Sequence, residues 1–276
     1  MDVSAPAWVE NRPTSGRRAL DWRELWRYRE LVAFLALRDV KVRYKQAAFG
    51  MLWAVVQPLA GLLVFTVVFH RLAKVPSDGV PYPLFALVGM TFWTLFSGGL
   101  HAATASLVAN AALVTKVYFP RVAAPLAAVL PRLVDLGVTL ALLAVLLLVT
   151  GTLPGPQVLL LPLVALWGVV LAFGVGLTFA TVQVRFRDAH HALSLMVQLW
   201  LYASPVAYPS SLVPPEWRWA YALNPVAGLL DTARWVLLDT RLPGWPALLS
   251  LAVTVGLLVL GIRVFAAGER RFADVI

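Results

Sequence analysis

Residues Leu136 to Val184 read LGVTLALLAVLLLVTGTLPGPQVLLLPLVALWGVVLAFGVGLTFATVQV, without a single Lys, Arg, Asp or Glu. A helix needs roughly 20 apolar residues to cross the hydrocarbon core of a bilayer, so this run is long enough for two crossings. The segment from Thr150 to Pro156 contains two glycines and two prolines, which end a helix and favour a turn. The run therefore predicts two transmembrane helices joined by a tight connection.

Four more stretches lack charged residues, namely 46 to 69, 79 to 115, 189 to 215 and 242 to 262. Strict alternation of apolar and polar residues, the mark of a membrane β-barrel, is absent from them. In lipid, only helices and closed barrels satisfy their own backbone groups, so we expect helices. The chain is predicted to be an all-α, multi-pass membrane protein with six transmembrane helices, at 50 to 70, 84 to 108, 128 to 150, 157 to 182, 190 to 208 and 245 to 265.

The charged residues indicate the orientation of these helices. Hydrophobic residues make up 60% of the chain, the mean hydropathy is +0.78, there is no cysteine, and the net charge is +9. Of the 23 Lys and Arg residues, 18 fall on or near one side of the predicted topology. The other five are Arg71, Lys74, Arg218, Arg234 and Arg241. The positive-inside rule then places both termini in the cytoplasm and the chain in the cytoplasmic membrane. The excess positive charge is explained by topology and lipid head groups, and nucleic acid is not an expected partner.

The first 45 residues contain no isolated apolar segment of a cleavable signal peptide, so insertion is expected to start at the first span. Within them, residues 21 to 46 have the pattern of an amphipathic helix, because Asp21 and Glu24 suit its first turn. We expect it to lie in the cytoplasmic head-group layer, after a disordered tail of residues 1 to 20. The alternative is a basic flank that only orients the first span. The interface residues are Trp22, Trp26, Arg38, Lys41, Arg43 and Lys45.

The loop at 109 to 121 combines Leu113, Val117, Tyr118 and Phe119 with basic residues on the predicted cytoplasmic side. An exposed apolar cluster with a basic rim is typical of a docking surface. The alternative is that the loop folds back on the protein's own helices. The chain contains no Gly-Lys dipeptide, hence no GxxxxGK[ST] loop for nucleotide phosphates, so any ATP must be hydrolysed elsewhere.

On the opposite side, residues 209 to 244 are rich in proline and aromatic residues. We expect two short helices that dip into the outer leaflet, in which Asp231 and Arg234 are spaced to meet on one face. The alternative is an interfacial loop with membrane-seeking aromatic side chains, among them Trp217 and Trp219.

Within the spans, aromatic and small polar residues together indicate a pathway for sugars, although ordinary helix packing is the better explanation for any single one. The candidates are Trp53, Gln57, Trp93, Ser97, Trp200 and Tyr202. Arg132 and Asp135 are spaced to form an ion pair near a membrane edge, either structural or part of a conformational latch. His190 and His191 point in different directions on a helix, so no metal site is expected.

Several motifs together resemble one family. They are WRYRELVAFLALRDVKVRYKQAAFGMLWAVVQPL at 26 to 59, TKVYFPR at 115 to 121, VRFRD at 184 to 188, SPVAYP at 204 to 209 and NPV at 224 to 226. The chain resembles, over nearly its whole length, the membrane subunits of ABC-2 type polysaccharide exporters, which move O-antigen, capsule, teichoic acid or galactan.

This resemblance implies an ABC-2 type transmembrane domain at 47 to 276 and a permease that is not itself an enzyme and has no catalytic residues. It implies a homodimer that binds two copies of a cytoplasmic ATPase subunit, which holds ATP and Mg, and that moves a lipid-linked polysaccharide. The coupling segment would be Leu113, Lys116, Val117, Tyr118, Phe119, Pro120 and Arg121, and the external gate Trp217, Trp219, Asn224, Pro225, Asp231 and Arg234.

Two other functions fit the sequence less well. A drug or small-lipid permease of the same fold would share the helices, but the interface segment and TKVYFPR favour a polysaccharide. A membrane-embedded glycan enzyme would need a carboxylate-rich site, and the outer loop offers only Glu216, Asp231 and Asp239.

Overall fold

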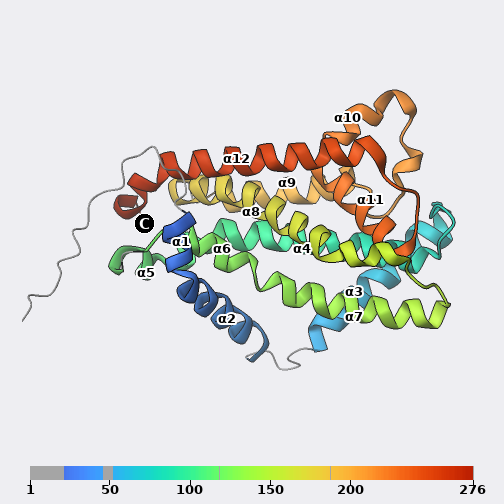
Figure 1. The fold of residues 1–276 in the computed structure, drawn as a ribbon, viewed down its shortest axis with the longest axis horizontal. Helices are drawn as coiled ribbons and strands as arrows, with labels where there is room; N and C mark the ends of the chain where they lie inside the picture. Colours follow the sequence, from blue (N-terminus) through green and yellow to red (C-terminus); the bar gives the residue numbers. More distant parts are fainter. Residues whose placement is uncertain (1–21, 46–51, 118, 187, 276) are drawn as a thin grey trace, which may run out of the picture.

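The computed structural model describes residues 22–45, 52–117, 119–186 and 188–275, and every regular element among them is helical. The longest helices run side by side along the length of the molecule (Figure 1). The all-α fold predicted from the sequence is thus confirmed. The predicted disordered tail lies outside the described residues.

Among the residues that the structure describes, five segments are long and apolar enough to cross a bilayer. They are α3 with the π-helical turn η1 (Leu52–Phe65 and Thr66–Leu72), α4 (Tyr82–Ala109), α6 with α7 (Ala123–Val129 and Arg132–Thr150), η2 with α8 (Pro156–Leu160 and Leu161–Arg185), and α12 (Gly244–Val275). The predicted turn between two of them is confirmed, because Gly151 ends α7 in a left-handed conformation, at φ 68°, that favours glycine.

The sixth predicted span is shorter than expected. Helix α9 (Ala189–Ala203) has 15 residues, about 22 Å at 1.5 Å per residue, which is less than the roughly 30 Å core of a bilayer. Its C-cap, Ser204, is extended, as the residue before a proline usually is. The chain reaches Pro209 without further helix, so the number of six transmembrane helices stays a prediction.

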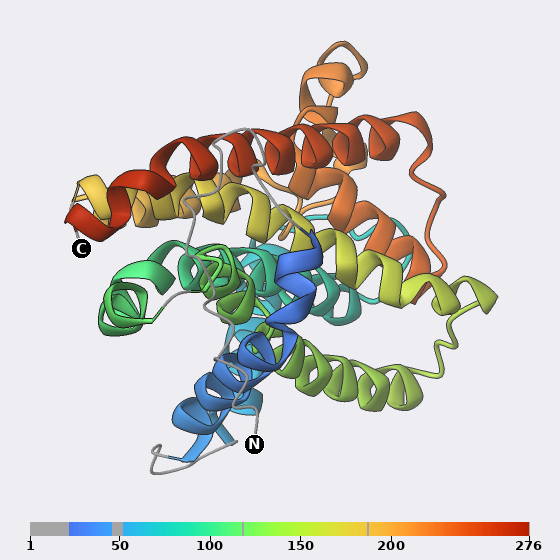
Figure 2. The same ribbon diagram turned by 60° about the vertical axis from the view of Figure 1, so that its left-hand side comes forward.

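The remaining helices are short and lie at the two ends of the bundle. At one end are α1 (Trp22–Arg27), α2 (Arg29–Lys45) and α5 (Ala111–Lys116). At the other are the single turns η3 (Ser210–Leu212) and η4 (Pro215–Trp217), followed by α10 (Arg218–Ala222) and α11 (Pro225–Leu238). Figures 1 and 2 show these two groups at opposite ends of the long helices.

The core is built around α4 and α8, which pack against each other over most of their length, while α12 covers the other side of α8. Small residues allow this close approach. A Cβ atom built on Gly261 of α12 would lie 2.1 Å from the carbonyl oxygen of Gly174 in α8, which leaves no room for a side chain. Close backbone contacts of this kind are how membrane helices associate without a hydrophobic driving force.

Helix α3 is held least firmly. No described residue of α3 or η1 is buried, although the segment is strongly apolar. Figures 1 and 2 place α3 with α7 on the side of the bundle away from α12. A helix of this composition needs lipid or another protein surface around it.

The close contact between α8 and α12 gives a direct stability test. We expect Gly261→Ala to lower the free energy of unfolding by about 1–3 kcal/mol, because the new methyl group must push two backbones apart. The measurement is thermal unfolding of the purified protein in a mild detergent.

The control for that test is Gly256→Ala in the same helix, where an added Cβ has no atom within 4 Å. This variant is expected to be as stable as the parent or slightly more stable, since alanine favours helix. Equal destabilisation by both substitutions would contradict the close-contact explanation.

Candidate functional site

At one end of the bundle, α1 and α2 rest on the transmembrane helices by one face only. Leu25, Val32 and Leu35 are buried, and α2 packs against α6. The opposite face exposes large apolar side chains, with Trp26 70% exposed. Arg38 bonds to Asp39 and to the Asn110 side chain at the end of α4, and Lys41 is exposed. The side chains of Trp22 and Lys45 are outside the described set.

The predicted coupling segment is only partly exposed. Phe119 is 4% exposed and packs in the chain's own core with Val114, which corrects the expectation that its ring is part of an exposed cluster. Leu113 and Pro120 are half-buried, and Tyr118 lies outside the described residues. The exposed remainder is the end of α5, at Lys116 and Val117.

Arg121 anchors this segment to the last helix. Its Nη1 donates a hydrogen bond to the backbone carbonyl of Glu269 in α12, far away in the sequence. The segment is therefore connected to the bundle at both ends, through α4 and through α12.

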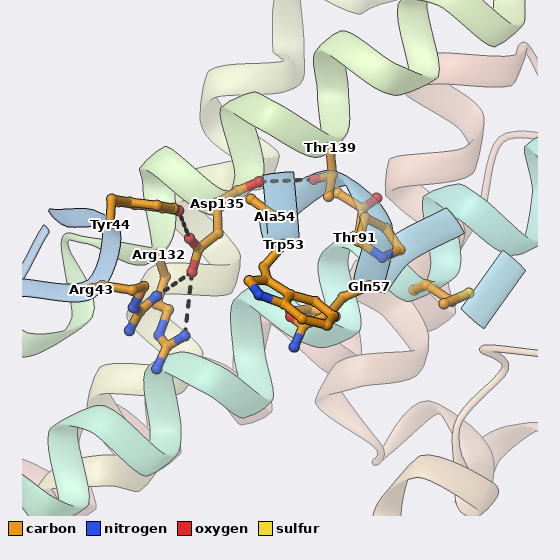
Figure 3. A pocket seen from close by; sticks show the side chains of 12 residues that line it. Arg43, Tyr44, Trp53, Ala54, Gln57, Thr91, Arg132, Asp135 and Thr139 are labelled. Carbon is orange, nitrogen blue, oxygen red and sulfur yellow. Dashed lines mark hydrogen bonds and ion pairs between the residues drawn. The ribbon is translucent and has the colours of Figure 1, made fainter. Parts of the chain in front are cut away.

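The charged cluster beside α2 is larger than the sequence indicated. Nη1 of Arg132 lies 3.3 Å from Oδ2 of Asp135, the expected ion pair. Oδ2 also accepts a hydrogen bond from Nη1 of Arg43, and the hydroxyl of Tyr44 donates to Oδ1 (Figure 3). Asp135 thus joins the end of α2 to the first turn of α7. Sequence reasoning missed Arg43 and Tyr44 as its partners because nothing local relates residues so far apart.

The environment keeps the Tyr44 hydroxyl protonated. Burial, followed by its hydrogen bond to the Asp135 carboxylate, raises the pKa of Tyr44 to about 12. The phenol is therefore a hydrogen-bond donor at any physiological pH.

This cluster forms one end of a cavity of about 500 Å³ between α2, α3, α4 and α7. Trp53 and Gln57, two of the predicted channel residues, line it from α3. The full lining is Arg43, Tyr44, Trp53, Ala54, Gln57, Pro58, Met90, Thr91, Thr94, Arg132, Asp135 and Thr139.

The other predicted channel residues do not line this cavity. Trp93 packs edge-on against Phe96, which in turn packs edge-on against Trp200. Ser97 is half-buried, while Tyr202 is 65% exposed. Of the six candidates, Trp53 and Gln57 line this cavity, and a pathway lined by all six stays a prediction.

At the far end of the bundle, Asn224 holds the end of α9 against the start of α11. Its Oδ1 accepts from Trp200 Nε1 at 2.9 Å and, as a helix cap, from the backbone N–H of Val226 at 3.1 Å. Its Nδ2 donates to Ser204 Oγ at 3.0 Å. The predicted NPV motif is thus the joint between these two helices.

A second, open cavity of about 550 Å³ lies beside this joint. The aromatic part of its lining consists of Trp200, Trp217 and Tyr221. The part at the start of α11 consists of Asn224 and Pro225. Trp219 is exposed.

Arg234 is a nearly fully buried cation in α11, 2% exposed. Its Nη2 donates to the carbonyl of Val206 at 3.0 Å, and its guanidinium lies 3.5 Å from the centre of the Phe85 ring. Its Nη1 is 3.8 Å from Asp231, an ion-pair distance but too long for a hydrogen bond. The expected approach of Asp231 and Arg234 is present, but the closer partners of Arg234 are in α4 and in the turn that follows α9.

That segment, residues 204 to 209, is held against α4 at two points. One is the Arg234 contact, and the other is the Tyr82 hydroxyl, which donates to the Ala207 carbonyl at 2.9 Å. Gly89 makes the approach possible, because a Cβ there would lie 2.7 Å from both Arg234 Nη2 and the Val206 oxygen.

No group of three or more His, Cys, Asp or Glu side chains that could hold a metal ion occurs among the residues that the structure describes. The rings of His101 and His190 are 6.2 Å apart, and His191 is adjacent to His190.

Comparison with known proteins agrees with this architecture. Residues 30–238 match the family model described as ABC-2 type transporter. The chain is 33% identical to the O-antigen export system permease protein RfbA of Myxococcus xanthus, over 92% of this chain and 98% of that protein. It is 29% identical to the Klebsiella pneumoniae protein of the same name, over 90% and 95%. It is 24% identical to the polysialic acid transport protein KpsM of Escherichia coli, over 78% and 82%.

The buried arginine supports a second stability prediction. We expect Arg234→Met to lower the free energy of unfolding by about 2–3 kcal/mol, because the Val206 carbonyl loses its donor and Asp231 loses its nearest cation. Cleavage of residues 204 to 222 by an added protease should accelerate.

The control is Arg241→Met, since Arg241 is exposed and removal of its charge leaves the segment in place. Gly89→Ala, which displaces the same contacts from α4, should reproduce the Arg234 phenotype in milder form. Unchanged protease resistance in both site variants would show that the segment is held by other contacts.

Proposed function

Because this chain belongs to the ABC-2 type transporter family, we propose that it is the membrane permease of an ATP-driven exporter that moves lipid-linked polysaccharide across the cytoplasmic membrane. The observation that carries the proposal is its similarity, over nearly the full length of both chains, to O-antigen export permeases. The similarity to a polysialic acid transport protein extends the comparison to a second polysaccharide. The multi-pass helical bundle provides the membrane scaffold.

The energy source is a separate subunit. The sequence has no GxxxxGK[ST] loop, so ATP and Mg bind to a cytoplasmic partner. The end of α5 is the docking point, because Lys116 and Val117 are exposed while Arg121 connects the same segment to α12. Movement of the partner is thereby transmitted to two transmembrane helices. This segment, from Leu113 to Arg121, is the proposed coupling element.

The working unit is a homodimer with two ATPase subunits. Helix α3 has no fully buried residue within one chain, and its exposed apolar side chains, among them Leu59, Leu63 and Val64, offer a surface to a second copy. Trp53 and Gln57, two of the channel candidates, lie on the same helix and line the cavity beside α2.

The basic end of the bundle faces the cytoplasm. Helices α1 and α2 expose large apolar side chains, including Trp26 and Phe34, next to the basic residues Arg38 and Lys41. This combination suits the head-group layer of the inner leaflet. Both termini are then cytoplasmic, as the positive-inside rule also predicts.

At the outer end, α10 and α11 form the proposed external gate. Asn224 ties them to α9, and Arg234 ties them to α4, so a shift of either transmembrane helix displaces the gate. The aromatic cavity beside them, with Trp200 and Trp217, offers ring faces to passing sugars.

The proposal is tested by deletion of the gene in the host cell. We expect lipid-linked polysaccharide to accumulate on the cytoplasmic side and to disappear from the surface. Labelling of the polysaccharide before and after membrane permeabilisation measures both pools. Normal surface polysaccharide with a changed resistance to drugs would favour a small-molecule exporter instead.

The docking point has its own test. Val117→Asp places a charge on the exposed end of α5 and should weaken binding of the co-expressed ATPase subunit about tenfold or more, with loss of polysaccharide-dependent ATP turnover. Co-purification and ATPase assays in lipid measure both.

Arg218→Asp is the control, because Arg218 is exposed at the opposite end of the bundle. Full complex formation by the Val117 variant would contradict docking at this segment, whereas failure of both variants would indicate a general folding defect.

A further inference from the structure

We infer that the cavity between α2, α3, α4 and α7 binds the phosphate head group of a lipid, with Arg43 and Arg132 as the anion-binding residues. The inference concerns binding by this chain itself and does not depend on the export of a polysaccharide. Its basis is the charge of the cluster, the composition of the cavity and the accessibility of its wall.

The cluster has more positive charge than the protein neutralises. Two guanidinium groups share one oxygen of one carboxylate, Oδ2 of Asp135. The other oxygen, Oδ1, is occupied by the Tyr44 hydroxyl. The four side chains therefore have a net charge of +1 at the edge of a membrane, where an unbalanced charge is costly and usually marks a functional site.

The hydrogen-bonding capacity of the two arginines is also unfilled. A guanidinium has five N–H donors, and the described contacts of Arg132 in this cluster are a single bond, at 3.3 Å, to Asp135. Its Nε is buried without any hydrogen-bond partner, so a ligand in the cavity would bind to the Nη1 and Nη2 groups. A phosphate group has several acceptor oxygens in the geometry that guanidinium groups prefer, so it would supply what Asp135 alone does not.

The position of Arg132 is set by the helix behind it. A Cβ on Gly98 of α4 would lie 3.2 Å from the guanidinium carbon, so the flat face of Arg132 rests on the α4 backbone. This support holds the cation in place at the wall of the cavity, where it lines the space with Arg43.

The cavity is polar at one end and more apolar at the other. The charges come from the last residues of α2 and the first turn of α7, while Ala54, Pro58 and Met90 line the part beside α3 and α4. About 500 Å³ is within the usual range for small-molecule sites. An amphipathic ligand matches this gradient better than a free anion, because its chain can lie along the apolar part.

A lipid can reach the cavity from outside the chain. Trp53 is 48% exposed and Gln57 is exposed, and both belong to the α3 wall. Figure 3 shows the Trp53 ring and the Gln57 side chain beside the charged cluster. Thr91 and Thr139 add hydroxyl groups at the same space.

The test uses the full chain, purified with any subunit that accompanies it and placed in phosphatidylcholine nanodiscs. Farnesyl diphosphate, farnesol, inorganic diphosphate and a short-chain phosphatidylglycerol are titrated separately, and dissociation constants are measured by calorimetry. We expect farnesyl diphosphate to bind at least about tenfold more tightly than farnesol and than inorganic diphosphate.

Three variants locate the site. Arg43→Gln and Arg132→Gln should each weaken farnesyl diphosphate binding about tenfold, since each removes a charge-assisted hydrogen bond. Asp135→Asn should tighten it, because the competing carboxylate is removed. A purely structural cluster would instead make all three changes harmful, so the opposite sign of the Asp135 effect distinguishes the two explanations.

Arg71→Gln is the matched control, as Arg71 is exposed and lies at the other end of α3 and η1. Arg43, which is more exposed than Arg132, keeps the test valid where Arg132→Gln does not fold. If phosphatidylglycerol binds as tightly as farnesyl diphosphate, the site accepts anionic lipids in general. If phosphatidylglycerol binds more weakly, the site prefers isoprenoid diphosphates. Either result supports the inference. Binding that is unaffected by Arg43→Gln, or equally tight binding of inorganic diphosphate, would overturn it.

Discussion

The structure depends on the close contact of α8 with its two neighbours. Helix α8 lies between α4 and α12, and its backbone touches that of α12 where Gly174 meets Gly261. In a bilayer, apolar side chains gain little by leaving lipid for protein, so this contact relies on dispersion forces and close fit. Helices α6, α7 and α11 pack against these three helices, while α2 is attached through α6.

The charged side chains of the bundle are stabilised by nearby polar, aromatic or oppositely charged partners. Arg234 is buried at one end of the bundle, where a carbonyl, an aromatic ring and a carboxylate surround it. At the other end, Asp135 joins two arginines and a tyrosine. Each cluster also links helices that are not adjacent in the sequence. An unpaired charge in an apolar medium is costly, so the oppositely charged and polar partners stay in contact.

These links give the proposed exporter a mechanical layout. Helix α2 is joined to α7 through Asp135, and the coupling segment is joined to α12 through Arg121. At the outer end, α11 is joined to α9 and α4. A force applied at the proposed coupling segment would therefore reach the proposed gate through the transmembrane helices. The cavity proposed to bind a lipid lies at the start of this route, between α2 and α3.

The sequence by itself determined the membrane class, the long helices, the turn at Gly151 and the family. In lipid every backbone group must be satisfied by a helix or a closed barrel, and long apolar runs without strict alternation leave only the helix. It also indicated the local pairs Arg132 with Asp135 and Asp231 with Arg234, since residues three apart on a helix are neighbours. Only the tertiary structure decided that Phe119 is buried and that Arg43 and Tyr44 complete the Asp135 cluster. These features result from contacts between helices distant in the chain, and the composition or period of a single helix has no information about which neighbour will cover it.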